Sequence, residues 1–362
     1  ICARLLLGIN ARHEQIAFCN TVADFDPDEI KRAMSVFSAV VPIEWKENKV
    51  NIIDTPGFFD FVSESLGALR VVDCAILVAA ANSGTEVGME KIWDSCGARS
   101  KARIMFVNKM DKENANFHHL MDEAKEKLKG ARVVPIQLPI GAAESFSGVV
   151  DLIDQKAYSF DTKGVPTEIE IPADMADEVE EHREQLVEAA AEATDELTEK
   201  FFEAMELSTE EIKAGLKILI ANGSVVPALC GSSVTLKGIS LLADAVVNYA
   251  PAPTAVSVAK DADGNEVEIA ADSKAPAVAL IFKTSSDPYV GKISYMRVFA
   301  GTLRPDTTLH NLARGIDEKI GNLLSIRGKS QEKISEAPAG DIVAVGRLGA
   351  SATGDTLCDA SR

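Results

Sequence analysis

Two short motifs carry side chains that suit phosphate and purine chemistry. DTPG (54–57) directly follows the apolar run VNII, so Asp54 stands where a strand would end. An aspartate there can hold Mg²⁺ through water, and the N–H of Gly57 can approach a terminal phosphate without steric hindrance. The bland alternative is an ordinary turn after a strand.

NKMD (108–111) follows the apolar run RIMFV and suits recognition of a base. The Asp111 carboxylate can accept two donors from a guanine, its N1–H and its exocyclic amine, while Asn108 reaches the N7 side and Lys109 covers the ring. Adenine lacks that pair of donors and would leave a buried carboxylate unpaired. A polar loop at a strand end is the alternative for this motif alone.

CGSS (230–233) follows a third apolar run, and its small residues would let backbone N–H groups approach a base carbonyl. Each motif is weak by itself. Their order along the chain, each directly after a predicted strand, is far more specific than any one of them.

The elements that must position these motifs alternate between strands and helices. The runs 50–54, 71–80 and 103–111 are short and apolar, and helix-like spacing separates them over 61–70 and 86–96. This alternation predicts a parallel sheet with helices on both faces, whose strands carry the ligand at their carboxyl ends.

The pattern changes twice further along the chain. From 132 to about 226, short strands and then an acidic helical stretch indicate an insertion in the α/β domain. After PAPTA (251–255), short β runs separated by Gly and Asp are typical of an antiparallel barrel. We therefore expect domains over 1–252 and 253–362.

Charge and composition limit the class of protein. The 362 residues are 46% apolar and 25% charged, which excludes a disordered or collagen-like chain. The chain has 37 Lys and Arg residues and 55 Asp and Glu residues, so its net charge is −18. The electrostatic field of such an acidic chain disfavours binding to naked nucleic acid. Residues 174–211 alone hold 15 acidic and two basic residues, which we interpret as a solvated helix face or, alternatively, a partner surface.

No apolar run reaches the roughly 18 residues that a membrane helix needs. The opening ICARLLLGIN is also too short, and it lacks the small-residue cleavage site of a signal peptide. The six cysteines show no C-x-x-C spacing, which favours a reducing compartment. We expect a cytoplasmic protein that uses neither a membrane nor sequence-specific DNA.

Taken together, the motifs resemble those of the translational GTPases, most closely bacterial elongation factor G. The likeness includes QLPIGAAESFSGVVDLIDQKAY, similar to that factor's inserted subdomain, and DPYVGKISYMRVFAGTL, similar to its second domain. It implies an α/β P-loop GTPase-type domain with an inserted α+β subdomain, followed by an antiparallel β-barrel domain. It also implies GTP and GDP as ligands with Mg²⁺, a monomer, and the ribosome as partner, including its stalk protein and large-subunit RNA.

The resemblance carries the family's binding residues onto this sequence. Ser35 falls in KRAMSVFSA, where the family has its first switch, and would meet Mg²⁺ together with Asp54 acting through water. The nucleotide-binding positions are Asp54, Thr55, Pro56, Gly57, Phe58, Asn108, Lys109, Met110, Asp111, Ser232, Ser233 and Val234.

Two departures from the family pattern stand out. The sequence contains no G-x-x-x-x-G-K-[ST], the loop that cradles phosphates. We expect the chain to begin just after that loop, as the N-terminal fragment of a longer protein; the alternative is a protein without the loop. The family's DTPGH reads DTPGF here, so Phe58 replaces the histidine that positions the attacking water.

No histidine lies near Phe58 in the sequence, and His118 and His119, on a helix-like stretch after the guanine motif, are interpreted as surface residues. Phe58 cannot hydrogen-bond water, so we hypothesise that hydrolysis is slow or uses another residue, against the alternative of a harmless variant. Four functions therefore stay open. They are an elongation factor G-like translocation factor, a ribosomal protection protein, a release-factor-type GTPase and a GTP-binding module with weak or no hydrolysis. The insertion and the barrel motif favour the first over a release factor.

Overall fold

The computed structural model describes residues 21–261, 263–287 and 291–360, so the opening ICARLLLGIN lies outside the described residues. It divides into two compact units. Within the described ranges, the first holds 45–48 and 73–251, and the second holds 21–44, 49–72 and the residues from 252 onward.

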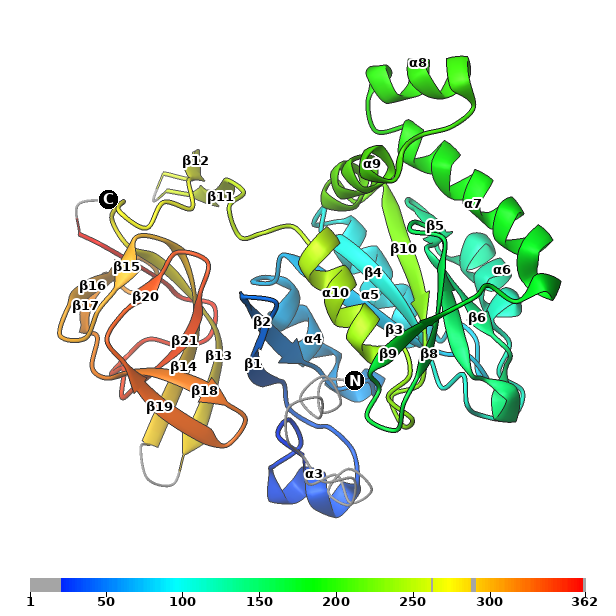
Figure 1. Cartoon of the computed structure of the whole chain (residues 1–362). Coiled ribbons are helices and arrows are strands. Elements are labelled where there is room, and N and C mark those ends of the chain that lie inside the picture. Colours follow the sequence, from blue (N-terminus) through cyan, green and yellow to red (C-terminus); the bar gives the residue numbers. More distant parts are fainter. Residues whose placement is uncertain (1–20, 262, 288–290, 361–362) are drawn as a thin grey trace. The chain divides into compact units, whose positions relative to one another are not determined.

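A four-stranded parallel sheet forms the centre of the first unit, as the sequence predicts (Figure 1). Its strands, in sheet order, are β3 (Cys74–Ala80), β4 (Ala102–Asn108), β10 (Val225–Cys230) and β5 (Arg132–Pro135). The apolar runs are buried because β4 and β10 are central: every residue of β10 is buried, and so are the first six of β4. The accompanying helices are α5 (Val87–Gly97), α6 (Phe117–Lys127) and α10 (Ile239–Tyr249).

A second, antiparallel sheet and three helices lie in the chain between β5 and β10. The strands are β6 (Gln137–Ile140), β7 (Gly148–Asp151), β8 (Lys156–Phe160) and β9 (Pro166–Ile169). The helices are α7 (Ala176–Ala191), α8 (Asp195–Ala204) and α9 (Thr209–Ala221). The acidic stretch is helical because its apolar residues recur on one side, and Leu186 and Ile212 are fully buried.

One strand prediction was wrong. The run 50–54 lies in β2 (Asn48–Asp54), which pairs with β1 (Ala39–Trp45) in a separate two-stranded sheet and not in the parallel one. The two-residue turn explains the pairing with β1, because Lys46 and Glu47 both have positive φ (45° and 62°), as in tight hairpin turns. Two short helices, α3 (Pro27–Arg32) and α4 (Val62–Leu69), flank this hairpin in the chain.

An eight-stranded antiparallel sheet dominates the second unit. In sheet order it comprises β17 (Ile316–Lys319), β16 (Thr308–Asn311), β22 (Thr356–Cys358), β13 (Val278–Asp287), β14 (Gly291–Ala300), β21 (Ile342–Gly346), β18 (Leu323–Arg327) and β19 (Ser330–Ile334). Strands from both halves of this order share one buried core, with Leu309 and Leu357 on one side and Leu323 on the other. The sheet therefore curls around its core as a barrel does. Two short pairs complete the strands, β11 (Ser257–Lys260) with β12 (Glu266–Ile269) and β15 (Thr302–Leu303) with β20 (Ala337–Pro338).

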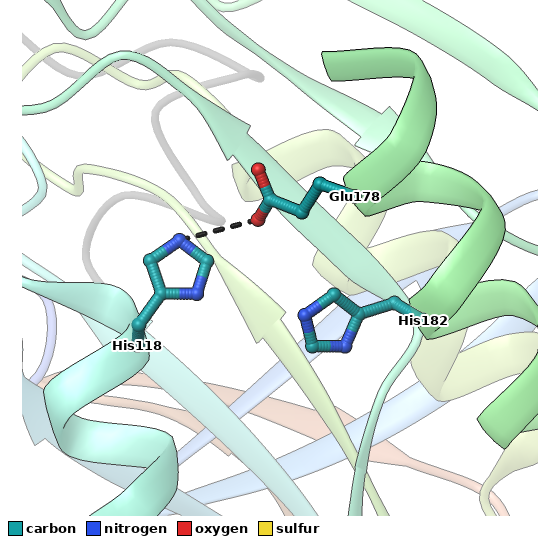
Figure 2. A group of neighbouring side chains, drawn as sticks. All are labelled: His118, Glu178 and His182. Carbon is teal, nitrogen blue, oxygen red and sulfur yellow. Dashed lines mark ion pairs between the residues drawn. The ribbon is translucent and has the colours of Figure 1, made fainter.

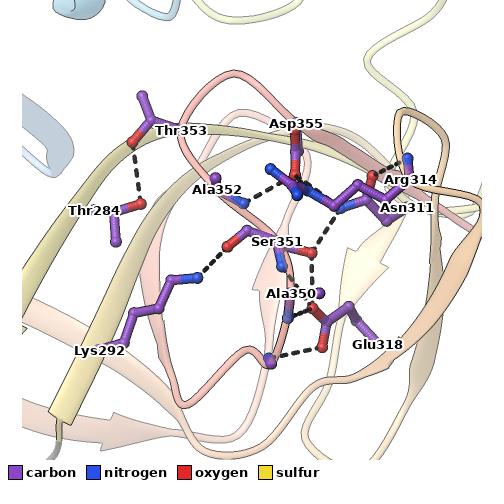
Figure 3. Close-up of polar contacts among 11 residues, drawn as sticks. Thr284, Lys292, Asn311, Arg314, Glu318, Ala350, Ser351, Ala352, Thr353 and Asp355 are labelled. Carbon is purple, nitrogen blue, oxygen red and sulfur yellow. Dashed lines mark hydrogen bonds and ion pairs between the residues drawn. The ribbon is translucent and has the colours of Figure 1, made fainter.

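A buried polar network fixes the loop between β21 and β22 (Figure 3). The Glu318 carboxylate accepts backbone N–H groups of Gly349, Ala350 and Ser351 at 2.8–3.0 Å. Asp355 accepts from the Arg314 guanidinium at 2.6 Å and from the Asn311 amide at 3.0 Å. Since Glu318 is 7% and Asp355 8% exposed, both charges are satisfied inside the protein.

Among the described residues, no helix has both the length and the apolar character to cross a bilayer. The cysteines described, Cys74, Cys96, Cys230 and Cys358, are all free thiols.

Candidate functional site

The ends of two neighbouring strands bring two of the predicted motifs together. β10 runs parallel to β4 with Cys230 opposite Val107, so NKMD and GSSV leave the sheet at the same edge. The Gly231 N–H donates to the Val107 carbonyl at 2.9 Å, and the Met110 N–H donates to the Gly231 carbonyl at 3.2 Å. The two loops are thus joined through their backbones.

Asn108 and Ser233 form two hydrogen bonds with each other across these loops. The Ser233 N–H donates to the Asn108 Oδ1 at 2.9 Å, and the Asn108 amide donates to the Ser233 hydroxyl at 3.2 Å. This pair fixes the plane of the amide before any ligand arrives, which lowers the ordering cost of binding.

Asp111 carries an unsatisfied acceptor inside the site. Its Oδ1 is buried without a hydrogen-bond partner, while Oδ2 lies 3.6 Å from the Lys112 Nζ. A buried carboxylate oxygen that goes unpaired costs free energy unless a ligand supplies a donor. The neighbouring Lys109 is exposed and has φ of 64°, and Met110 below it is fully buried.

A glycine is required at position 231 of the second loop because neighbouring atoms crowd it. A Cβ on Gly231 would lie 2.4 Å from the Lys237 carbonyl oxygen and 2.9 Å from the Phe106 ring. Ser232 is fully buried, its N–H donating to the same Lys237 carbonyl at 2.9 Å, and Val234 is 49% exposed. The N–H groups of Ser232 and Ser233 are therefore both bonded within the protein.

DTPG lies in the second unit, after β2. Asp54 ends that strand and is half-buried, as is Thr55, and Pro56 is buried. A Cβ on Gly57 would meet nothing within 4 Å, so the space beside its backbone is open. Phe58 is 59% exposed and offers no hydrogen-bonding group where the family pattern has a histidine.

Ser35 lies in a segment that a buried carboxylate organises. Glu29, 2% exposed, accepts the backbone N–H groups of Val36 and Phe37, each at 3.0 Å. The Ser35 hydroxyl donates to the Asp24 Oδ1 at 2.6 Å. The segment therefore holds its shape through carboxylates of its own.

Sequence reasoning missed a polar triad that ties this segment to α4 and β13 within the second unit. The Glu64 carboxylate accepts the Ser38 N–H at 2.8 Å and its hydroxyl at 2.6 Å. The Lys283 Nζ donates to the Ser38 carbonyl at 2.5 Å and lies 3.2 Å from Glu64. Burial lowers the pKa of Lys283, and for Glu64 burial is outweighed by the Ser38 hydrogen bonds and Lys283, so its pKa is lowered too. The three residues lie far apart in sequence and share no motif, so no signal pointed to them.

Comparisons with known proteins identify the family of the chain. Residues 1–252 match the family model of the elongation factor Tu GTP binding domain, and residues 276–360 match that of elongation factor G domain 2. The crystal structure of a protein from Thermus thermophilus is similar over 100% of this chain and 52% of its own, with a TM-score of 0.86 and 26% identity. The chain thus spans about half the length of that protein. Because the first model covers more than half of the 362 residues, the chain belongs to the family of the elongation factor Tu GTP-binding domain, as an elongation factor G-like translational GTPase.

Proposed function

We propose that this protein binds GTP and GDP with Mg²⁺ and acts on the ribosome as a translocation-type factor, with Asp111 selecting guanine. The observation that carries nucleotide recognition is the buried, unpartnered Oδ1 of Asp111 beside the locked Asn108–Ser233 pair. A guanine edge offers two adjacent donors, and a carboxylate is the acceptor-only group that satisfies both.

The surrounding residues suit the rest of a base. The Lys109 stem is exposed above the loop and can cover an aromatic ring, while the buried Met110 anchors the backbone. The Ser232 and Ser233 N–H groups hold the loop by donating to the Lys237 carbonyl and to the Asn108 Oδ1, and the Val234 N–H would reach the base carbonyl. Thr55, Pro56, Gly57 and Phe58 would meet the phosphates.

Ser35 and Asp54 fit Mg²⁺ by donor type, because hydroxyl and carboxylate oxygens are ligands this ion prefers. The Ser35 hydroxyl donates its hydrogen bond to Asp24, so the lone pairs of its oxygen are left to bind a cation. When bound, the ion would neutralise charge on the phosphates.

Exchanging the acceptor at Asp111 tests the base preference directly. Asp111→Asn replaces two acceptor oxygens with one acceptor and one donor, which matches xanthine and mismatches guanine. We expect GDP affinity to fall by about 10²-fold or more, and xanthosine diphosphate to bind the variant better than the wild type. Calorimetry with GDP, ADP and xanthosine diphosphate measures this. Wild-type binding that is equal for GDP and ADP would overturn the assignment.

Slow or absent hydrolysis is the second candidate, and Phe58 is the observation that favours it. Losing one positioning group costs roughly 10²–10⁴-fold in turnover. We expect Phe58→His to raise ribosome-stimulated GTP hydrolysis by at least about 10²-fold, with Phe59→His, at a neighbouring half-exposed ring, as the control. Strong stimulation of the wild type that Phe58→His leaves unchanged contradicts this expectation.

The wider role rests on the resemblance. We propose a GTPase domain over 1–252, with its insertion at about 132–226, and a barrel domain over 253–362 that belong to a longer cytoplasmic protein. Translocation of tRNA by the whole protein, compared with removal of a ribosome-bound antibiotic, separates a translocation factor from a ribosomal protection protein.

A further inference from the structure

Two histidines and a glutamate from different helices of the first unit converge in one place. His118 belongs to α6, and Glu178 and His182 belong to α7 (Figure 2). Each offers one ligand atom, and these atoms all lie within 4.8 Å of one another. Nothing in nucleotide recognition uses this cluster.

The helices fix the backbone positions of these three residues independently of any ligand. Glu178 and His182 are four residues apart and so share one face of α7. On α6, Asn116 caps the helix by accepting the His119 N–H at 3.0 Å, and Phe117 beside His118 is 2% exposed. These capping and apolar contacts fix the start of α6, and a ligand held on fixed backbone is pre-organised for binding.

The polar atoms within the cluster are poorly satisfied by one another. The His182 Nδ1 is buried and lacks a hydrogen-bond partner. The Glu178 Oε1 lies 3.2 Å from the His118 Nε2, yet it too lacks an aligned hydrogen bond. Buried acceptors without donors favour a cation in the space between them.

We propose that His118, Glu178 and His182 form a Zn²⁺ site that joins α6 to α7. Two imidazoles and one carboxylate are a ligand set that zinc accepts, with a fourth position left for water. The surrounding acidic residues of α7 add attraction for a divalent cation.

The three ligand atoms lie up to 4.8 Å apart, and the ligand atoms around one zinc ion lie closer together than that. Zinc binding therefore requires small rotations of these side chains. His118 is 55% exposed as a side chain and has room to turn. The site would cross-link α6, which follows the guanine loop, to the inserted helices.

Zinc titration of the untagged protein tests the proposal. We expect one Zn²⁺ per chain by calorimetry, and an upward shift of the unfolding temperature with Zn²⁺. His182→Ala and Glu178→Gln should each weaken Zn²⁺ binding by more than about tenfold and abolish the temperature shift.

His119→Ala is the matched control, since His119 is the next residue of α6 and its side chain is 67% exposed. It should keep the wild-type affinity. The proposal is overturned if the wild type binds no Zn²⁺, if His182→Ala binds it unchanged, or if His119→Ala loses it equally. Circular dichroism of each variant without metal confirms that the fold is intact.

Discussion

Gly231 shows how one missing side chain shapes the candidate nucleotide site. Its own N–H and carbonyl join the two loops, and a Cβ would meet the Lys237 carbonyl oxygen at 2.4 Å. We expect Gly231→Ala to destabilise the protein by about 1–3 kcal/mol through overpacking and to weaken GDP binding, measured by urea unfolding and calorimetry.

A glycine with ordinary space around it serves as the control. In Gly67→Ala the new Cβ would lie 3.6 Å from its nearest neighbour, in the middle of α4. The free energy of unfolding of that variant should equal the wild-type value or exceed it by up to about 1 kcal/mol, because alanine has the higher helix propensity. Equal losses in both variants would contradict the role given to Gly231.

At this scale the sequence predicted what local motifs encode. Asn108, Asp111 and Ser233 are predicted site residues because each comes at the end of a predicted strand and has a recognisable side-chain chemistry, and the structure brings the two loops that hold them to one edge. The His118–Glu178–His182 cluster was not predicted. Its helices meet only through tertiary packing, and His118 was expected to be a surface residue, which its exposure confirms.

The segment 35–38 depends on elements that lie far from it in the chain. Lys283 of β13 and Glu64 of α4 hold Ser38 from two sides, and the Lys283 side chain is 13% exposed. We expect Lys283→Met to cost about 2–4 kcal/mol, because Glu64 is left without its cation. Amide hydrogen exchange of Phe37 and Ser38 should speed up by about tenfold or more.

An exposed ion pair of the second unit provides the comparison. Lys319 and Asp306 lie 2.8 Å apart with side chains 68% and 80% exposed, so Lys319→Met should cost less than about 1 kcal/mol. It should leave exchange of the 35–38 amides unchanged. Unchanged exchange in Lys283→Met would show that Lys283 does not order the segment.

Elements were predictable where the periodicity of the apolar residues was clear. The parallel sheet and the acidic helices could be predicted from the spacing of their apolar residues. The strand with which β2 pairs could not. Alternation with helices suggested a parallel strand, yet the tight turn at Lys46 and Glu47 pairs β2 with β1 in a hairpin. Local turn chemistry outweighed the pattern of the wider sequence.

The whole chain carries a net charge of −18 near neutral pH, so mild acid should relieve repulsion as the pH approaches its isoelectric point of about 4.8. Specific carboxylates act in the opposite direction. Burial opposes ionisation of Glu318, but the N–H groups of Ala350, Gly349 and Ser351 outweigh it and lower its pKa. Burial likewise opposes ionisation of Asp355, and Arg314 and Asn311 outweigh it, so that its pKa is also lowered.

Because the pKa of Glu318 is lower in the native state than in the unfolded chain, there is a range of pH in which the native carboxyl group is charged and the unfolded one is protonated. The stability from Glu318 is therefore complete above its ordinary unfolded pKa, and it is lost as the pH falls through the lower native value. We expect Glu318→Gln to be about 2–3 kcal/mol less stable than the wild type at pH 7, by urea unfolding of the protein. This difference in stability between Glu318→Gln and the wild type should narrow steadily below about pH 4.

Glu336→Gln, at the exposed pair with Arg304, is the control, and its stability should differ little from that of the wild type at any pH. A Glu318→Gln deficit that stays constant down to about pH 3 would mean that packing, and not charge, holds this loop.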